Sequence, residues 1–582
     1  MTNKNSIKLP IGYSDFKETI DNKCYFIDKS LFIKDIIDDS AKVILLTRPR
    51  RFGKTLNLSM LRYFFEKTNA PGNKYLFTGL RISQGDESYW QHHNKYPVIF
   101  VTLKDIKTDN FDLAYHRIET LVANLYSKYS ELLESDFLDN RKKRIFKSVL
   151  EGEGSYIDVQ DALKNLTEYL YAYYNVKPII LIDEYDTPIQ ASYSHGYYEK
   201  MIDFMRGFYS VTLKDNQYLH KAVLTGILRV AKENIFSGLN NLEVYTLLQS
   251  EYSQYFGFTE QEVDELCKKA AIETKLENIR DWYNGYQIGD SIIYNPWSIV
   301  NCVKHGGKLE PYWVNTSDNA LIKDIITNSG RDFKHHFEQL LAGESIKEFI
   351  DPNIIFSDLQ NSEAAIWTLL LMSGYLKATS CVLTEDQYVC ALEIPNKEVM
   401  SLYAGMIRKW IFGHKNYQWY NRFLNYLREG DIDAFAAALQ EIALDMFSYH
   451  DLARKPENFF HGFTMGLIAS LRNEYYIISN HESGYGRYDV AMFPKLNAKQ
   501  PAIIFEFKNA TKDTETALKE AACEALNQID KQRYAAAIQK FHADIIFKVG
   551  VAFCGKKIYV AHAKEIPALP QSKNINNTEI NN

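Results

Sequence analysis

The first residues with recognisable chemistry form a basic loop that ends in Gly53-Lys54-Thr55. A loop that binds nucleotide phosphates requires backbone N–H groups at a helix N-terminus, a lysine for the β- and γ-phosphates, and a hydroxyl for Mg²⁺. We therefore predict an ATP and Mg²⁺ site with contacts from Arg51, Phe52, Gly53, Lys54, Thr55 and Leu56. Arg48 stands where such loops usually have their first glycine, so the alternative is a basic turn with an accidental Gly-Lys-Thr.

A second group of residues, at the end of another apolar run, completes the nucleotide chemistry. Asp183 and Glu184 directly follow Pro178-Ile179-Ile180-Leu181-Ile182. An aspartate at a strand end can hold the Mg²⁺ shell, and a following glutamate can orient the water that attacks the γ-phosphate. Because both groups occur in the required order, we favour an ATPase over the basic turn. Asp186 is a weaker candidate.

Two further residues are candidates for contact with the γ-phosphate. Thr225 ends the apolar run Ala222-Val223-Leu224, and Arg229 follows it shortly. A polar residue at a strand end can sense the γ-phosphate, and a guanidinium can bind phosphate directly. For both residues a purely structural role is an equal alternative. The sequence does not indicate which residues hold the base.

A second site is predicted near the C-terminus, where two carboxylates and a lysine lie on two predicted strands. Glu506 and Lys508 are two residues apart in an alternating run, so they project from one face of the strand. If the strand around Asp489 pairs with this run, Asp489 reaches the same place. Asp489 and Glu506 would then bind Mg²⁺, and Lys508 would orient or help to deprotonate the water that attacks a phosphodiester.

Alternatives remain for this C-terminal site. Glu506 and Lys508 could form an ordinary salt bridge at a sheet edge. Glu457 and His461, four residues apart on a predicted helix, could add a metal ligand, although such a pair is more often a solvated helix face. Gln528, on the predicted helix after the site, could contact a DNA backbone, whereas Tyr534 is expected in the core.

The elements that must position these residues predict an α/β protein. Short apolar runs at 43–47, 98–103, 178–183, 222–225 and 242–247 alternate with helical patterns. Such runs indicate a mostly parallel sheet that is covered on both faces. We predict a P-loop NTPase domain at 1–250, a mostly helical lid or connector at 251–450, an α/β restriction-endonuclease-like domain at 451–565, and a disordered tail at 566–582.

The middle region contains one interruption in its helical pattern. Residues 364–376 predict a buried helix and 388–394 predict a strand, which is typical of either a winged-helix-like element or a plain connector. Aromatic clusters at 282–286 and 294–297 are either recognition surfaces or, more commonly, the packing of a helical subdomain.

Composition restricts the class of protein. With 582 residues, of which 24% are charged, the chain is neither disordered nor fibrous. It contains no apolar run of about 18 residues, so no membrane span is predicted, and its polar N-terminus does not resemble a signal peptide. Seven cysteines without close pairs predict neither a disulfide framework nor a zinc site, and they favour a reducing cytoplasm. The net charge is −6 overall but +3 within 451–565, so charge neither supports nor excludes nucleic acid.

The two groups of residues together resemble two known families. Residues 6–250 resemble the bacterial AAA-ATPase-like family through Leu9-Pro10-Ile11-Gly12, Tyr25-Phe26-Ile27-Asp28-Lys29-Ser30, the loop at 48–55 and Leu181-Ile182-Asp183-Glu184-Tyr185-Asp186. Residues 451–565 resemble the PD-(D/E)XK nuclease superfamily through Gly486-Arg487-Tyr488-Asp489 and Glu506-Phe507-Lys508. Tyr488 stands where that superfamily has proline. The resemblance implies an ATPase coupled to a metal-dependent nuclease.

Two functions are therefore expected. The first is an ATP-hydrolysing module that gates or positions a Mg²⁺-dependent DNA nuclease, with DNA as partner. The alternative is a nucleotide-switched protein whose nuclease fold binds nucleic acid or a partner without cutting. Because ATPases often complete their sites between subunits, a homo-oligomer is a further expectation.

Overall fold

The computed structural model describes two compact units. The described residues are 7–67, 72–229, 241–314, 322, 325–326, 329–353, 356–360, 362–384, 387–412, 417–446, 464, 468, 471, 474–483, 486–495, 500–531, 543–554 and 557–566. The first unit comprises 1–329 and 345–400, and the second comprises 330–344 and 401–582. The division into three domains stays a prediction, and the predicted tail beyond residue 566 lies outside the described residues.

The first unit is built on a five-stranded parallel sheet, which confirms the predicted fold class. The order is β2-β3-β4-β1-β5, with β1 at Val43–Thr47, β2 at Val98–Thr102, β3 at Ile179–Asp183, β4 at Lys221–Gly226 and β5 at Leu242–Tyr245. Every residue of β1 and β3 is buried, as expected for apolar strands inside a covered sheet. Strand β4 lies between β1 and β3, so their carboxyl ends meet at one edge.

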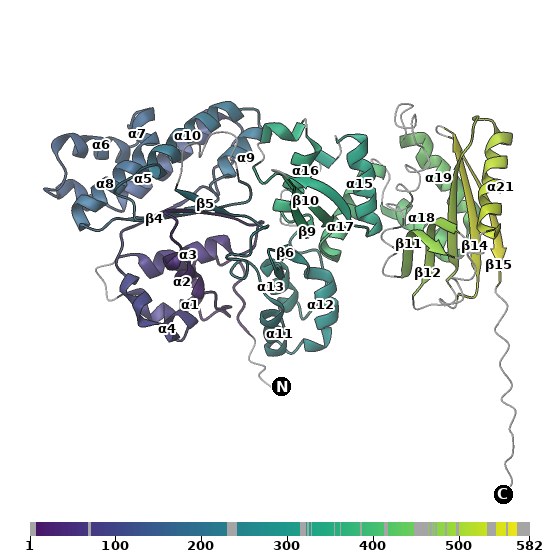
Figure 1. The fold of residues 1–582 in the computed structure, drawn as a ribbon, viewed down its shortest axis with the longest axis horizontal. Helices are drawn as coiled ribbons and strands as arrows, with labels where there is room; N and C mark the ends of the chain where they lie inside the picture. Colours follow the sequence, from purple (N-terminus) through teal and green to yellow (C-terminus); the bar gives the residue numbers. More distant parts are fainter. Residues whose placement is uncertain are drawn as a thin grey trace, which may run out of the picture. The chain divides into compact units, whose positions relative to one another are not determined.

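Helices cover both faces of this sheet (Figure 1). One layer contains α1 (Phe16–Asp21), α2 (Leu31–Asp38), α3 (Lys54–Phe65) and α4 (Arg81–Gln84). The other contains α5 (Phe111–Ser127), α6 (Asn140–Leu150), α7 (Tyr156–Gln160), α8 (Ala162–Tyr174) and α10 (Tyr198–Leu213). The short α9 (Thr187–Ser194) directly follows the carboxylates at the end of β3. None of the described helices is both long enough and apolar enough to cross a membrane.

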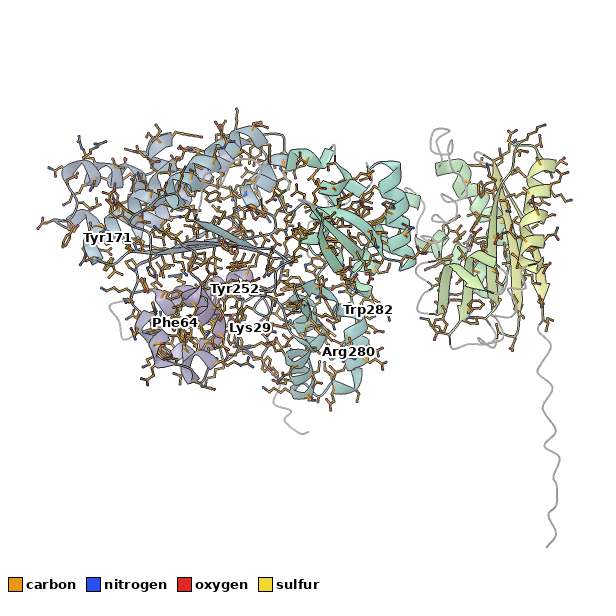
Figure 2. All side chains as sticks on the ribbon, in the orientation of Figure 1. Lys29, Phe64, Tyr171, Tyr252, Arg280 and Trp282 are labelled. Atoms are coloured by element: carbon orange, nitrogen blue, oxygen red, sulfur yellow. A yellow bond between two sulfur atoms is a disulfide. The ribbon has the colours of Figure 1, made fainter. Side chains whose placement is uncertain are left out.

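The N-terminal segment is joined to the rest of the first unit through a buried lysine. Lys29 (Figure 2) donates hydrogen bonds to the carbonyl of Gln254 at 2.6 Å and to both carboxylate oxygens of Glu262 at 2.7 Å. Glu262 lies on α11 (Glu260–Lys269). The segment that resembles the ATPase family therefore contributes to packing in this unit.

The aromatic clusters of the middle region are mostly part of a core. The elements here are α12 (Leu276–Tyr283), β6 (Tyr286–Ile288), β7 (Ser291–Ile293) and α13 (Pro296–Lys304). Tyr283 and Tyr294 are fully buried, and Trp282 (Figure 2) packs against the same apolar cluster. These contacts favour the packing interpretation over a recognition surface.

A small antiparallel sheet follows, in the order β8-β10-β9. Its strands are β8 (Ile346–Ile350), β9 (Lys377–Thr384) and β10 (Gln387–Glu393), and α16 (Glu363–Met372) precedes the β9–β10 hairpin. The predicted buried helix and the predicted strand correspond to α16 and β10. Strands β8 and β9 were not predicted, because most residues of β9 are exposed and several are polar. The winged-helix-like interpretation stays a prediction.

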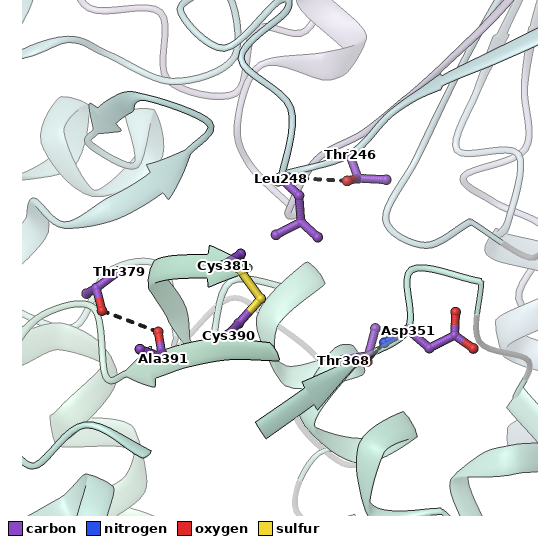
Figure 3. Close-up of a disulfide and its surroundings, with 8 residues drawn as sticks. All are labelled: Thr246, Leu248, Asp351, Thr368, Thr379, Cys381, Cys390 and Ala391. Atoms are coloured by element: carbon purple, nitrogen blue, oxygen red, sulfur yellow. Dashed lines mark hydrogen bonds between the residues drawn. A yellow bond between two sulfur atoms is a disulfide. The ribbon is translucent and has the colours of Figure 1, made fainter. Parts of the chain in front are cut away.

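A disulfide corrects the expectation that the cysteines do not pair. Cys381 and Cys390 are directly opposite each other in the β9–β10 register and are bonded (Figure 3). The two residues are nine positions apart, and only the hairpin brings them together. The other five cysteines are free.

A buried carboxylate makes the stability of the first unit depend on pH. Glu398, on α17 (Lys397–Phe412), is fully buried and accepts hydrogen bonds from the Ser298 hydroxyl at 2.7 Å and the Trp313 backbone N–H at 2.6 Å. Burial raises its pKa to about 7 from an ordinary value of 4.5. The contribution of Glu398 to stability is therefore fully present below pH 4.5 and is lost as the pH rises through 7.

We expect Glu398→Gln to remove this dependence, since an uncharged amide can accept from Trp313 and donate to Ser298. Relative to the variant, the wild type should lose about 3 kcal/mol of unfolding free energy between pH 4.5 and pH 8. Urea unfolding of both proteins at pH 4.5 and pH 8 measures the difference, with the exposed Glu277→Gln as control. Parallel pH profiles for wild type and Glu398→Gln would show that the interpretation of this carboxylate is wrong.

The second unit contains a mixed five-stranded sheet, as predicted for the C-terminal part. Its strands lie in chain order: β11 (Tyr475–Ser483), β12 (Gly486–Pro494), β13 (Ala502–Asn509), β14 (Ile546–Cys554) and β15 (Lys557–Glu565). Neighbours are antiparallel except β13 and β14, which are parallel, with α21 (Glu515–Lys531) between them in sequence. The unit also contains α15 (Arg331–Ala342), α18 (Tyr417–Glu429) and α19 (Ile432–Met446).

The side chains of β13 point alternately to the two faces of the sheet, as predicted. Ile504 packs in an apolar cluster with Ile529 of α21, whereas Phe505 contacts Phe435 of α19 with ring centroids 5.7 Å apart. Glu506 shares the face of Ile504, so it is directed toward α21. Gly550, its partner on β14, allows the close approach of that helix. A Cβ at this position would lie 2.2 Å from the Ala522 carbonyl oxygen.

We expect Gly550→Ala to destabilise the second unit, because the added methyl group would meet helix backbone that a side-chain rotation cannot move. The expected loss is about 1–3 kcal/mol of unfolding free energy, measured by urea unfolding. Gly85→Ala is the control, since its Cβ would meet only one atom, at 3.9 Å. Equal stability of the two variants would contradict the close packing of α21.

Candidate functional site

The basic loop connects the buried strand β1 to the N-terminus of α3, as a phosphate-binding loop must. Gly53 caps α3 with a φ of 85°, a left-handed conformation that favours glycine, and Arg51 also has a positive φ of 69°. No atom lies within 4 Å of a Cβ built at Gly53, so glycine serves the conformation here and not a close approach. The amides of the first turn of α3 have no intrahelical partners and are available to an anion.

The ammonium of Lys54 lies across this loop. It donates hydrogen bonds to the carbonyls of Arg48 at 2.9 Å and Pro49 at 2.8 Å, and the residue is only 5% exposed. Burial lowers its pKa, while the charges of Glu184, Asp183 and Asp186 act in the opposite direction. A lysine held in the mouth of the loop, among carboxylates, is placed to exchange these carbonyls for phosphate oxygens.

Asp183, at the end of β3, is hydrogen-bonded to the end of β4 and to the N-terminus of α3. One carboxylate oxygen accepts from the Thr55 hydroxyl and the other from the Thr225 hydroxyl, both at 2.7 Å. Asp183 is fully buried, and burial raises its pKa against these two hydrogen bonds. A carboxylate and a hydroxyl in contact are the oxygen ligands that Mg²⁺ uses at nucleotide sites, so the residues fit this ion.

The next carboxylates have different surroundings. Glu184 has a positive φ of 53° and accepts from the Thr187 hydroxyl at 3.2 Å. Asp186 is buried and accepts from the backbone N–H groups of Ile227 and Leu228 at 2.8 and 3.0 Å. Asp186 therefore fixes the segment after β4, which accounts for it without a catalytic role. Glu184 remains the partly exposed carboxylate beside the loop.

Arg48 has a structural role that explains its presence at the usual glycine position. Its side chain is completely buried and donates to the carbonyls of Thr47, Tyr245, Thr246 and Glu251 at 2.8–3.2 Å. It thereby joins the end of β1 to the segment after β5. Burial lowers its pKa to about 9. No signal in the sequence indicated that this arginine points away from the phosphate side.

The other predicted contacts of the loop divide between backbone and side chain. Phe52 is buried against Tyr286 with ring centroids 5.1 Å apart, so only its backbone can contact a nucleotide. The Arg51 guanidinium lies 4.5 Å from the Trp297 ring centroid. Leu56 is partly exposed. Arg229 is also partly exposed, just before residues 230–240, which are outside the described part.

Sequence reasoning missed two residues beside the loop. Arg50 donates from its guanidinium to the Gln190 side-chain oxygen at 2.8 Å, and its carbonyl accepts from the Trp313 indole N–H at 3.1 Å. Gln190 lies on α9, six residues after Glu184. Arg50 lies within the loop at 48–55 but was not assigned a role, and Gln190 belongs to no motif, because only the fold brings α9 and Trp313 to the loop.

The structure brings Asp489 and Glu506 together in the second unit. They lie one step beyond the paired residues Val490 and Phe505 in the β12–β13 register. Asp489 accepts from the Phe507 backbone N–H at 2.8 Å, and Glu506 accepts from the Gln528 amide. Gln528 therefore orients a carboxylate, and its contact with a DNA backbone stays a prediction. Lys508, two residues after Glu506, lies on the same face and is partly exposed.

Two carboxylates from one face of a sheet fit a hard divalent cation. Within the described part of the chain, no group of three His, Cys, Asp or Glu side chains gathers at a distance suited to a metal. Glu457, His461 and Tyr534, which were considered from the sequence, lie outside the described residues.

Comparison with known proteins agrees with this two-part organisation. Residues 10–236 match the family model described as "Predicted AAA-ATPase", and residues 455–563 match that of the PD-(D/E)XK nuclease superfamily. The chain is 27% identical over 395 residues to an "Uncharacterized protein in vnfD 5'region" of Azotobacter chroococcum mcd 1. That match covers 67% of this chain and 68% of the relative.

Proposed function

We propose that this chain, which combines an AAA-ATPase-like domain with a PD-(D/E)XK nuclease superfamily domain, hydrolyses ATP to control a Mg²⁺-dependent deoxyribonuclease site. The observation that carries the nucleotide part is the contact of Thr55, Asp183 and Thr225 beside Lys54. These four side chains come from the ends of two strands, β3 and β4, and from the N-terminus of one helix, α3, and they supply the groups that phosphoryl transfer requires.

In the ATPase site each residue has a separate task. The amides at Gly53 to Leu56 and the ammonium of Lys54 would bind the β- and γ-phosphates. Thr55 and Asp183 would hold Mg²⁺, which when bound neutralises charge on the phosphate oxygens. Glu184 would orient the attacking water and accept its proton, while Thr225 holds Asp183 in place. Arg229, in the segment after β4, would contact phosphate.

In the nuclease site Asp489 and Glu506 would hold Mg²⁺, which when bound polarises the scissile phosphate. The Phe507 N–H and the Gln528 amide fix the orientation of these two carboxylates. Lys508 would orient the attacking water and ease the loss of its proton. The substrate class that fits this chemistry is DNA.

The proposal places the protein in the cytoplasm, where ATP and DNA are present. A homo-oligomer remains part of the proposal, because a neighbouring subunit can complete an ATPase site.

One observation favours the alternative, a nucleotide-switched binding protein that does not cut. The described part of the second unit provides two carboxylates and no third His, Cys, Asp or Glu ligand. Assays of ATP hydrolysis and of single- and double-stranded DNA cleavage with Mg²⁺ distinguish the two functions. We expect both activities, each abolished by EDTA. DNA that is bound in a nucleotide-dependent way but never cleaved would favour the alternative.

A further inference from the structure

The three arginines of the loop have three different environments. Arg48 is buried and donates to four carbonyls, and Arg51 lies over Trp297. Arg50 is half-buried, and its guanidinium is held by the neutral side chain of Gln190 at 2.8 Å. Among the described residues it forms no ion pair. Arg50 is therefore the loop arginine that is partly buried and whose guanidinium is held by a neutral side chain.

Gln190 ties this guanidinium to α9, the helix that also contacts Glu184. Thr187, which donates to the Glu184 carboxylate at 3.2 Å, lies three residues before Gln190 on α9. Residues three apart on a helix are neighbours, with Cβ atoms about 5–6 Å apart. The same face of α9 thus holds the carboxylate expected to orient water and the guanidinium of Arg50.

Arg50 also lies beside Lys54. The Lys54 ammonium contacts the carbonyl of Pro49, the residue before Arg50, at 2.8 Å. The charges acting on this ammonium are those of Glu184, Asp183, Asp186 and Arg50. The backbone of Arg50 is fixed as well, since its carbonyl accepts from the Trp313 indole at 3.1 Å. Both the side chain and the backbone of Arg50 are therefore fixed, and the residue directly follows a carbonyl that Lys54 contacts.

We propose that Arg50 is a catalytic residue that contacts the γ-phosphate of ATP from within the same chain, and that Gln190 is its positioning residue. The proposal rests on the ATPase function proposed above. In the step, the water oxygen bonds to the γ-phosphorus and the water proton passes to Glu184. The bond from phosphorus to the β–γ bridging oxygen breaks, with its electron pair on ADP. Arg50 stabilises the charge on the γ-phosphoryl oxygens as that bond breaks.

The test compares Arg50→Ala, Arg50→Lys and Gln190→Ala with the exposed Arg141→Ala of α6 in the full chain. We expect Arg50→Ala to lower kcat about 100- to 1,000-fold, as for loss of one transition-state donor, with ATP affinity within about threefold of wild type. Gln190→Ala and Arg50→Lys should each lower kcat about tenfold. Gln190→Ala keeps the guanidinium but removes the side chain that positions it, and Arg50→Lys keeps the positive charge but removes the planar guanidinium. Arg141→Ala should retain the wild-type rate.

Two readouts separate catalysis from a structural role. Wild type should bind ADP with aluminium fluoride and Mg²⁺ more tightly than ADP alone, and Arg50→Ala should lose this preference. Added guanidinium should partly restore hydrolysis by Arg50→Ala. If Arg50→Ala hydrolyses ATP at a rate within threefold of the wild type, the inference about Arg50 is overturned and the ATPase proposal is not. If Arg50→Ala does not fold, an unchanged kcat in Arg50→Lys overturns it. A wild type without hydrolysis overturns the ATPase proposal and this inference together.

Discussion

Changing Lys54 to alanine is expected to reduce ATP hydrolysis by about 100- to 1,000-fold, as when one preorganised donor to a transition state is removed. ATP binding should weaken as well, because Lys54 contributes positive charge in a site with three carboxylates. Phosphate release under single-turnover conditions measures the rate, and equilibrium binding of a fluorescent ATP analogue measures the affinity.

The control for this variant is Lys147→Ala on α6, where the side chain is 64% exposed. The melting temperature of each variant shows whether the fold is kept. Hydrolysis by Lys54→Ala at the wild-type rate would show that the basic loop is not the phosphate site, whatever the fold of the first unit.

The second large effect is expected in the nuclease site. Asp489→Asn should lower the rate of DNA cleavage by about 100-fold or more, because the neutral amide cannot replace the negative charge that holds a divalent cation. The fold should be kept, since the amide oxygen can still accept from the Phe507 N–H. Lys508→Ala should lower the cleavage rate to a similar extent, because the attacking water would lose the ammonium that orients it. Cleavage of labelled single- and double-stranded DNA with Mg²⁺ measures both.

Matched controls come from an exposed ion pair of the same unit, Asp513 and Lys557, whose charged groups are 3.2 Å apart. Asp513→Asn and Lys557→Ala should cleave DNA like the wild type. Cleavage that survives in Asp489→Asn would mean that the activity comes from another site or from a contaminating nuclease.

The sequence predicted the elements whose residue pattern is local and strong. The runs that became β1, β3 and β13 are short and apolar, so their positions and their terminal carboxylates could be read directly. Their alternation and order also placed Thr55 near Asp183 and Asp489 near Glu506, as the structure shows.

Features that depend on distant residues could not be predicted. Arg48 occupies a glycine position because carbonyls of residues 245–251, far away in sequence, accept its hydrogen bonds. Strand β9 has many exposed residues and is a strand only because β10 pairs with it, which also explains the missed disulfide. The hydrogen bond from Gln528 to Glu506 was not predicted, since nothing local indicates that α21 approaches Glu506.

The central claim is that the nucleotide site controls cleavage by the nuclease site. The direct measurement is the initial rate of DNA cleavage with Mg²⁺, with and without ATP, for wild type and Lys54→Ala. The account predicts that ATP changes the wild-type rate and leaves the rate of Lys54→Ala unchanged, with no cleavage by Asp489→Asn. Equal wild-type rates with and without ATP, or no cleavage of any DNA by the wild type, would contradict it.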